Sequence, residues 1–388
     1  MIGYNRVMNA ALYIHFPFCL QKCLYCDFNS VVDSRTSPAE YVAAVEREMA
    51  LRRESLAADV SAPTLYFGGG TPSLLDPSLV TRLIEAAARF YALEAAAEIT
   101  LEANPGTVTR DKLAGYRAAG VNRLSLGVQS FHDPLLTRLG RIHSAGEALA
   151  AFAAARDAGF ANIGIDLIHS LPGENLALWL ADLARAVALA PEHISGYGLS
   201  IEAGTPFHDL KRAGELALPD EEEAAGMFEQ TSEVLGKAGY EHYEISNFAR
   251  PGFRSRHNQV YWRRTGYLGF GAGAHSFLAA PSFGCRWKNP DTPDVYLQAL
   301  GKDIVADEGL AAVTKREAMA ETLFLGLRML EGVDSKEFRR VFGVTLEEAY
   351  PAALPRLLTD ALLEWQEGRL RLTRRGLIMA NQVFVKFI

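Results

Sequence analysis

Disulfides, long apolar runs and a secretion signal are scarce or missing in this sequence. The 388 residues include only four cysteines, too few for a disulfide scaffold. No uninterrupted apolar run reaches about 18 residues, so we expect no membrane span. The first six residues lack the basic segment and apolar run of a signal peptide. The cytoplasm is therefore the expected location.

Positive charge is also scarce relative to negative charge. The chain has 39 Lys and Arg residues against 46 Asp and Glu residues, which gives a net charge of −7. Sequence-independent binding to nucleic acid usually needs a basic protein surface. We therefore expect no nucleic-acid partner, and we interpret the arginines between Arg369 and Arg375 as part of a solvated hairpin or a lid.

What the sequence does have is a regular alternation of short β-rich runs and Ala-rich amphipathic segments, which predicts parallel β/α units. Ser37 and Asp76 are predicted helix N-caps, each followed by proline. The predicted strands are Ala11–His15, Thr64–Phe67, Glu98–Glu102, Arg123–Val128, Asn162–Ile168 and His193–Ser200. The predicted helices are Pro38–Leu56, Pro77–Tyr91, Arg110–Ala118, Ser144–Ala158 and Ala177–Leu189. Six units favour an α/β fold, an incomplete (β/α)6 TIM-like barrel.

The pattern changes after the sixth unit. We expect the barrel over residues 1–215, a barrel-completing segment over 216–305 and a smaller winged-helix-like domain over 306–388. Within the middle segment, Glu241–Phe277 is predicted to be irregular and to lie across the barrel mouth. In the last domain, we predict a hairpin that pairs Leu362–Trp365 with Arg369–Leu372.

Three of the four cysteines lie within eight residues, directly after the first predicted strand. Cys19, Cys23 and Cys26 have the spacing C-x3-C-x2-C. Thiolates are the ligands of iron–sulfur clusters, and three of them leave one iron of a [4Fe–4S] cubane for S-adenosylmethionine (SAM). An electron from the cluster would then cleave SAM. A zinc site is the alternative, although zinc normally takes four ligands.

A run of three glycines ends the second predicted strand, at Gly68 to Gly70, and Thr71 follows it. Glycines let the backbone approach a ligand closely. Because the dinucleotide fingerprint and the phosphate-loop lysine are absent, we interpret the run as a cradle for the methionyl end of SAM, with a simple turn as the alternative.

Polar side chains recur at the ends of the later strands, where barrels build their sites. Glu102 and Arg141 are candidates for the amino and carboxylate groups of SAM, and Asp166 for a ribose hydroxyl or an amine. Gln129 lies on the same rim. Tyr25 lies inside the cysteine loop. We expect it to cover the cluster or to stack on adenine, with packing of the loop as the alternative.

A histidine and aromatic rings occur together at His257 to Trp262, followed by a glycine-rich stretch that ends at His275. Imidazole is a common ligand of haem iron, so His257 is a candidate haem ligand, with a hydrogen-bonded structural histidine as the alternative. His275 and Ser276 are candidates for lining the SAM pocket, and Cys285 is interpreted as a buried thiol.

Taken together, these motifs resemble the HemW-type radical-SAM proteins, which are relatives of oxygen-independent coproporphyrinogen III dehydrogenase. The resemblance rests on the cysteine loop, the stretch from Gly68 to Ser73, Leu101 to Pro105, Leu124 to Phe131, Ile165 to Gly173, and His257 to Trp262. It implies a partial (β/α)6 barrel of radical-SAM type with an accessory C-terminal domain.

The resemblance also implies site residues. One SAM at the cluster would be lined by Tyr13, by Gly69 or Gly70, by Glu102 and by a contact near His275. In the dehydrogenase a second SAM is held, and the matching positions here are Tyr25, Thr71, Gln129, Arg141, Asp166 and Ser200.

The function implied is that of a haem chaperone, which binds haem and transfers it to acceptor haemoproteins such as respiratory membrane proteins. Two departures weaken the alternative, oxidative decarboxylation of coproporphyrinogen III. The dehydrogenase has a further cysteine where this chain has Phe28, and it has an N-terminal extension, whereas only twelve residues precede Tyr13 here.

Overall fold

The computed structural model of the protein describes residues 7–32 and 34–388. The first six residues, on which the prediction about a signal peptide rests, lie outside the described part. No helix in the described ranges combines the length and the apolar character that crossing a bilayer requires.

The centre of the molecule is a curved sheet of parallel strands, as predicted. Six strands, β2 to β7, follow one another in the sheet in the order of the chain, and the pairs that they form with one another are parallel. A short strand, β1, adds to the start of β3. Their bounds are β1 Met8–Asn9, β2 Ala11–Phe16, β3 Val60–Gly69, β4 Ala92–Ala103, β5 Arg123–Gln129, β6 Ile163–His169 and β7 His193–Gly198. The predicted strands are thus confirmed, and their ends shift by up to six residues, the largest shift being at the start of β4.

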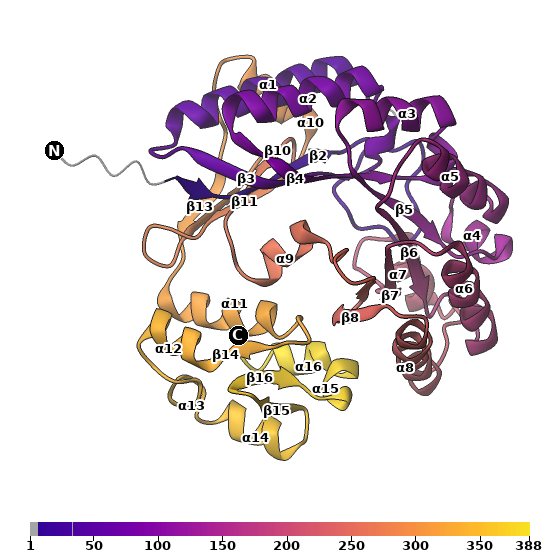
Figure 1. The fold of residues 1–388 in the computed structure, drawn as a ribbon, viewed down its shortest axis with the longest axis vertical. Coiled ribbons are helices and arrows are strands. Elements are labelled where there is room, and N and C mark those ends of the chain that lie inside the picture. Colours follow the sequence, from indigo (N-terminus) through magenta and orange to yellow (C-terminus); the bar gives the residue numbers. More distant parts are fainter. Residues whose placement is uncertain (1–6, 33) are drawn as a thin grey trace.

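Helices cover the outer face of this sheet (Figure 1). The predicted N-caps are present: the Ser37 side chain accepts a hydrogen bond from the Glu40 amide, and Asp76 accepts one from Ser78. These caps satisfy amide groups that the helix itself leaves free. The covering helices are α1 Pro38–Ser55, α2 Pro77–Phe90, α3 Arg110–Ala119, α4 Asp133–Leu139, α5 Ala145–Asp157, α6 Leu176–Leu189 and α8 Glu221–Lys237, with 3-10 turns η1 Pro72–Leu74 and η2 Pro105–Thr107.

The segment from Glu241 to Phe277 differs from the prediction. It is not irregular, because it adds strands to both margins of the sheet. At one margin β9 is antiparallel to β7, and at the other β10 is parallel to β2. The elements of this region are β8 Glu241–Glu244, β9 Asn247–Ala249, α9 Arg256–Trp262, β10 Tyr267–Phe270, β11 His275–Leu278, β12 Cys285–Lys288, α10 Pro293–Leu300 and β13 Glu308–Ala312. The strands are too short for an alternating pattern to reveal them.

A buried ionic network fastens α1 to the end of β10. The carboxylate of Glu48, on α1, accepts hydrogen bonds from the Arg52 side chain (2.7 Å), the Gly271 amide (2.9 Å), Asn289 Nδ2 (2.8 Å) and the Tyr296 hydroxyl (2.7 Å). Buried charges are tolerated when they are paired and hydrogen-bonded in this way.

The C-terminal region has its own apolar core and a three-stranded sheet in the order β14-β16-β15. The predicted hairpin is present as β15 and β16. The elements are α11 Lys315–Gly326, β14 Val333–Asp334, α12 Ser335–Phe342, α13 Leu346–Ala349, α14 Ala353–Thr359, β15 Leu363–Gln366, β16 Arg369–Leu372, α15 Arg374–Ile378 and α16 Ala380–Phe384.

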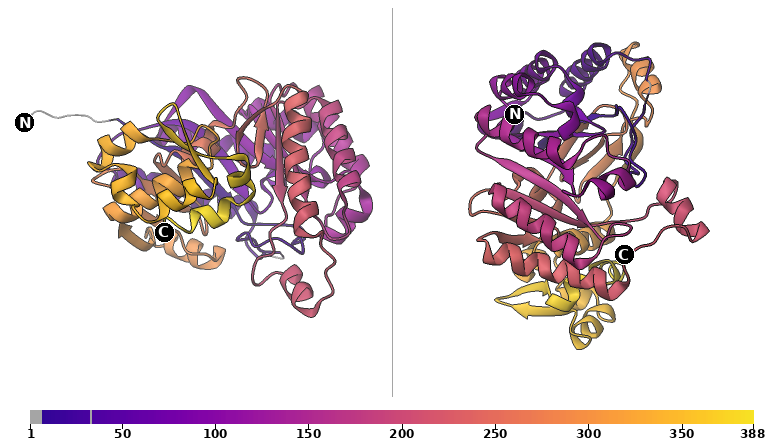
Figure 2. Two further views of the ribbon diagram at one scale, coloured as in Figure 1. Left: turned by 90° about the horizontal axis from the view of Figure 1, so that it is seen from below. Right: turned by 90° about the vertical axis from the view of Figure 1, so that its right-hand side faces the viewer.

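This region contacts both margins of the main sheet (Figure 1). α11 follows β13 directly in the chain. At the other margin, the amide of Ile245 donates to Arg328 O (3.0 Å) and the amide of Leu330 donates to Tyr243 O (3.1 Å). Helix α7 (Pro206–Ala213) projects beyond the ends of the strands, away from the rest of the molecule (Figure 2).

Candidate functional site

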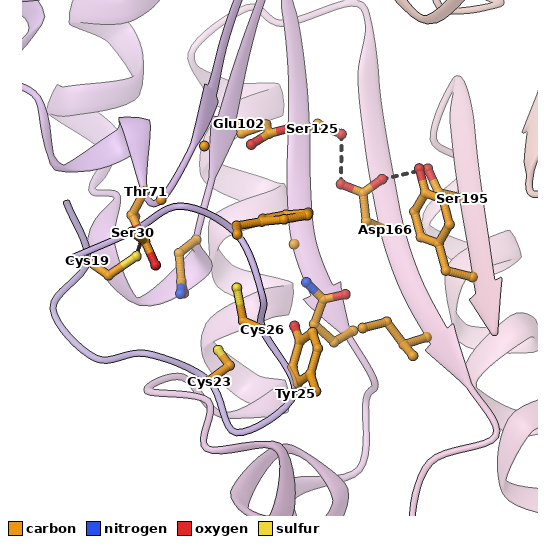
Figure 3. Close-up of a pocket in the computed structure, with 18 of the residues that line it drawn as sticks. Cys19, Cys23, Tyr25, Cys26, Ser30, Thr71, Glu102, Ser125, Asp166 and Ser195 are labelled. Atoms are coloured by element: carbon orange, nitrogen blue, oxygen red, sulfur yellow. Dashed lines mark hydrogen bonds between the residues drawn. The ribbon is translucent and has the colours of Figure 1, made fainter. Parts of the chain in front are cut away.

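A cavity of about 440 Å³ runs from the carboxyl ends of the parallel strands into the interior of the sheet (Figure 3). Strands β3 to β7 and the loop after β2 all contribute side chains to its wall. Most of the predicted site residues line it: Cys19, Cys23, Tyr25, Cys26, Gly69, Gly70, Thr71, Glu102, Gln129, Arg141, Asp166 and Ser200.

The three clustered cysteines are free thiols on one loop that faces this cavity. Backbone hydrogen bonds hold the loop in place: the Cys19 amide donates to Val31 O (3.0 Å), and the Leu24 amide donates to Leu139 O (3.1 Å). The hydroxyl of Thr71 lies 3.4 Å from Cys19 Sγ, and Arg141 Nη1 lies 3.4 Å from Cys23 Sγ. A cationic guanidinium thus lies beside one of the three candidate ligand sulfurs.

The donor set fits an iron–sulfur cluster with an incomplete set of protein ligands. Cys285 belongs to β12 and does not line the cavity. Within residues 7–32 and 34–388, no three His, Cys, Asp or Glu side chains are grouped to hold a single metal ion. A cubane binds each thiolate through a different iron, so three thiols on one loop suit it.

Two close neighbours, the His15 ring on β2 and the cysteine loop, require glycine at positions 69 and 70. Gly69 has φ of +112°, and a side chain there would have its Cβ 2.6 Å from His15 Cε1. A Cβ on Gly70 would lie 2.7 Å from Phe18 O and 3.0 Å from Cys19 Sγ. Residues with side chains therefore do not fit at this strand end unless the His15 ring or the cysteine loop moves.

Two carboxylates face the cavity in different surroundings. The hydroxyl of Tyr66 donates to Glu102 Oε1 (2.7 Å), yet burial raises the pKa of Glu102 to about 7, and Asp166 adds to this rise. Asp166 accepts hydrogen bonds from Ser125 (2.7 Å) and Ser195 (2.6 Å), as Figure 3 shows, and burial raises its pKa as well. Near neutral pH, Glu102 can change its charge.

Tyr13 and His275 do not line this cavity. Tyr13 belongs to β2, and its hydroxyl is hydrogen-bonded to His15 Nδ1 (3.0 Å) beside the ring of Tyr66. His275 starts β11 and faces a separate cavity on the other side of α9. The predicted SAM contacts at these two positions are therefore not brought together with the others.

His257 is 1% exposed, at the first turn of α9. Its ring stacks on Tyr66, and both ring nitrogens are occupied: Nδ1 lies 2.8 Å from Thr64 Oγ1, and Nε2 lies 2.9 Å from the Tyr261 hydroxyl. Burial lowers its pKa to about 3, so the ring is neutral. The ring therefore holds α9 and Tyr261 in place.

Sequence reasoning missed several residues of the cavity wall. Arg123 is 2% exposed and lines the cavity, and its Nε makes no hydrogen bond within the described residues. Asn258, next to His257, also faces the cavity. A hint was available for Arg123, because an arginine inside an apolar strand is rarely buried without a partner or a ligand.

The profile of the Radical SAM superfamily matches residues 13–186, and that of the HemN C-terminal domain matches residues 313–379. The solved structure described as "Coproporphyrinogen III oxidase (HemN) from Escherichia coli is a Radical SAM enzyme" has the same fold, with a TM-score of 0.84, 24% identity, and coverage of 99% of this chain and 91% of that chain. Fold and site thus define a radical SAM protein.

Two relatives with known names identify the family within this superfamily. The protein named Heme chaperone HemW from Bacillus subtilis is 36% identical over 382 residues, which cover 97% of this chain and 98% of the relative. The protein of the same name from Synechocystis is 40% identical over 337 residues, covering 84% and 80%. The chain belongs to the HemW family of radical SAM proteins. Membership in the radical SAM superfamily implies a [4Fe–4S] cluster and SAM as cofactors.

Proposed function

We propose that this protein is a haem chaperone that binds a [4Fe–4S] cluster, SAM and haem, and transfers haem to acceptor haemoproteins. The observation that carries the proposal is similarity over nearly the whole chain to relatives named Heme chaperone HemW. The acceptors would include membrane-associated respiratory proteins. Haem binding and transfer would take place in the cytoplasm.

The cluster ligands in this proposal are Cys19, Cys23 and Cys26, because their thiols share one loop and one cavity. When bound, the cluster and SAM supply one-electron chemistry. The chain itself contributes binding groups. Glu102 would accept the amino group of SAM, and Arg141, already beside Cys23, would contact its carboxylate.

The other predicted contacts, Tyr25, Thr71, Gln129, Asp166 and Ser200, line the rest of the same cavity and would hold the nucleoside or a second SAM. A haem-binding role for the segment from His257 to Trp262 is part of the proposal. His257 can ligate iron only if it gives up Thr64 or Tyr261, so we assign it a positioning role.

Oxidative decarboxylation of coproporphyrinogen III is the competing function. The shared superfamily fold and the cavity favour it. The side chain two residues after Cys26 disfavours it, because Phe28 is 61% exposed there and offers no thiol.

The test uses the full-length protein, reconstituted anaerobically with iron and sulfide. Haem is titrated by absorption, and the haem-loaded protein is mixed with an apo-haemoprotein to measure transfer. We expect saturable haem binding and transfer, and no protoporphyrinogen after addition of coproporphyrinogen III, SAM and a reductant. Protoporphyrinogen formation, or failure to bind haem, would overturn the proposal.

Cysteine variants test whether the three thiols of the loop bind the cluster. Cys19→Ser, Cys23→Ser and Cys26→Ser should each lose the Fe–S absorption and the EPR signal. Cys285→Ser is the matched control, because that thiol lies outside the cavity, and it should keep both signals.

A further inference from the structure

The barrel cavity extends to a layer of residues that lies deeper than the predicted SAM contacts. Arg123, Gly164 and His193 lie at the starts of β5, β6 and β7, and Gly164 is in register with His193. Both Arg123 and His193 line the cavity. Alternate residues of a strand face the same side, so this layer lies two residues, or about 7 Å, further from the rim than the layer around Asp166 (Figure 3).

Two buried nitrogens of this deep layer lack a hydrogen-bond partner. Arg123 Nε and His193 Nδ1 accept from and donate to no residue in the ranges 7–32 and 34–388. Both side chains are almost fully buried. A buried donor without an acceptor is costly, and most such groups in proteins are paired. Two of them on the wall of one cavity indicate a ligand that accepts hydrogen bonds.

The His193 ring presents an N–H group to the cavity. Its Nε2 lies 2.8 Å from the Tyr243 hydroxyl, and that hydroxyl already accepts a hydrogen bond from the Ser255 amide (3.3 Å). The hydroxyl proton therefore goes to Nε2, which places the proton of the ring on Nδ1. Burial and the nearby charge of Arg123 hold the pKa of His193 well below its ordinary value, so the ring is neutral.

Arg123 supplies a positive charge at the same place. Burial lowers the pKa of Arg123, but nearby acidic groups, Glu98 foremost, raise it by more. The two oxygens of Glu98 are already engaged, because they accept hydrogen bonds from the amides of His257 (3.0 Å) and Arg256 (3.1 Å). A guanidinium binds a carboxylate through two parallel N–H groups, and Nε belongs to one such pair with Nη2.

Gly164 leaves the space in which an acceptor would sit. A Cβ at this position would lie 3.4 Å from Arg123 Nη2 and 3.5 Å from His193 Nδ1. The missing side chain thus opens a small space that both donors border. A carboxylate in this space would accept from the guanidinium and from the imidazole at once.

Asp166, in the next layer toward the rim, restricts the rest of the ligand. Its carboxylate faces the cavity and accepts hydrogen bonds from Ser125 and Ser195. Like charges brought together in a site disfavour binding, so a second carboxylate on the ligand would be repelled here. The deep layer therefore suits an acid with one carboxylate and not a dicarboxylic acid.

We infer that Arg123, Gly164 and His193 form a subsite for the carboxylate of a small monocarboxylic acid at the inner end of the barrel cavity. This goes beyond haem delivery, because it gives the barrel a small-molecule ligand of its own. The methionyl carboxylate of SAM is the other source of the same chemistry, and the first test separates the two.

The first test uses the full-length protein, reconstituted anaerobically with iron and sulfide, and ligand-observed NMR with acetate and its neutral isostere acetamide. We expect saturable acetate binding that is at least tenfold tighter than acetamide binding. Gly164→Ala fills the space and should weaken acetate binding at least tenfold. Gly236→Ala, where the added methyl group meets open space on α8, is the matched control and should bind acetate normally.

Three outcomes of this test would overturn the inference. They are the absence of acetate binding, equal binding of acetate and acetamide, and unchanged acetate binding in Gly164→Ala. SAM affinity should persist in Gly164→Ala, which also shows that the variant is folded. A loss of SAM affinity that matches the loss of acetate affinity would assign the subsite to SAM and overturn the monocarboxylic acid.

The second test examines the fork and the neighbouring charge. Arg123→Lys keeps the positive charge but lacks the planar fork, so the preference for acetate over acetamide should fall at least fivefold. Arg110→Lys, an exposed position at the start of α3, should keep the preference. Butyrate should bind more tightly than succinate, which has the same number of carbons and a second carboxylate near Asp166. An unchanged preference in Arg123→Lys, or tighter binding of succinate, would overturn the assignment.

Discussion

The charge of Glu102 should control SAM binding near neutral pH. This carboxyl faces the barrel cavity, and burial raises its pKa to about 7. Below that pH it is mostly protonated and cannot attract the positively charged SAM. About one tenth of Glu102 is ionised at pH 6 and about nine tenths at pH 8, so affinity should rise about tenfold over this range, or about 1.4 kcal/mol.

The assay is SAM binding to anaerobically reconstituted protein, by calorimetry at several pH values. Glu102→Gln is the matched control, because it keeps the shape and removes the ionisation. The amino group of SAM also titrates, and the difference between the two profiles isolates the contribution of Glu102. Identical profiles for the wild type and the variant would refute the reasoning.

A second variant checks the direction of the effect. The hydrogen bond from Tyr66 holds the pKa of Glu102 lower than burial alone would set it. Tyr66→Phe removes that bond, so the midpoint should move upward by about one pH unit. A downward shift would contradict this account.

Two further predictions concern the scaffold. Glu48→Ala leaves the buried Arg52 with an incomplete set of partners, so the free energy of unfolding should fall by about 3 kcal/mol in a denaturant titration; a loss below about 1 kcal/mol would show that the network is unimportant. Gly70→Ala pushes a methyl group toward Cys19 Sγ and should reduce the iron and sulfide content, whereas Gly226→Ala, which meets open space on α8, should keep both; full cluster content in the first variant would contradict the packing argument.

The local parts of the fold could be predicted from the sequence. The N-cap at Ser37 and the strand through Glu102 are encoded within a few residues, by a capping side chain and by an apolar run. The place of β10 beside β2 could not be predicted, because Tyr267 pairs with Ala11 across most of the chain, and a four-residue strand carries no readable period.

The positions of the site residues could likewise be predicted only in part from the sequence. Side chains at strand ends, such as Glu102 and Asp166, meet because parallel strands end on one rim. His275 was expected on that rim as well, but it follows a strand added at the margin of the sheet and faces the separate cavity on the other side of α9. The exposure of Arg123 to the barrel cavity depends on the curvature of the sheet, which no local motif encodes.

In the part of the chain that the structure describes, the main sheet runs from β13 to β8 without closing on itself, and helix α11 crosses the opening. α11 continues from β13 at one margin, and the backbone that follows it is hydrogen-bonded to Tyr243 and Ile245 at the other. Its 12 residues make a strut about 18 Å long. A ligand that moves the two margins of the sheet apart must therefore also bend or shift α11, or break its contacts at one margin. The cavity lined by Tyr261 and Tyr267 also borders this helix, through Glu321, Phe324 and Leu325, so its shape depends on the width of the barrel.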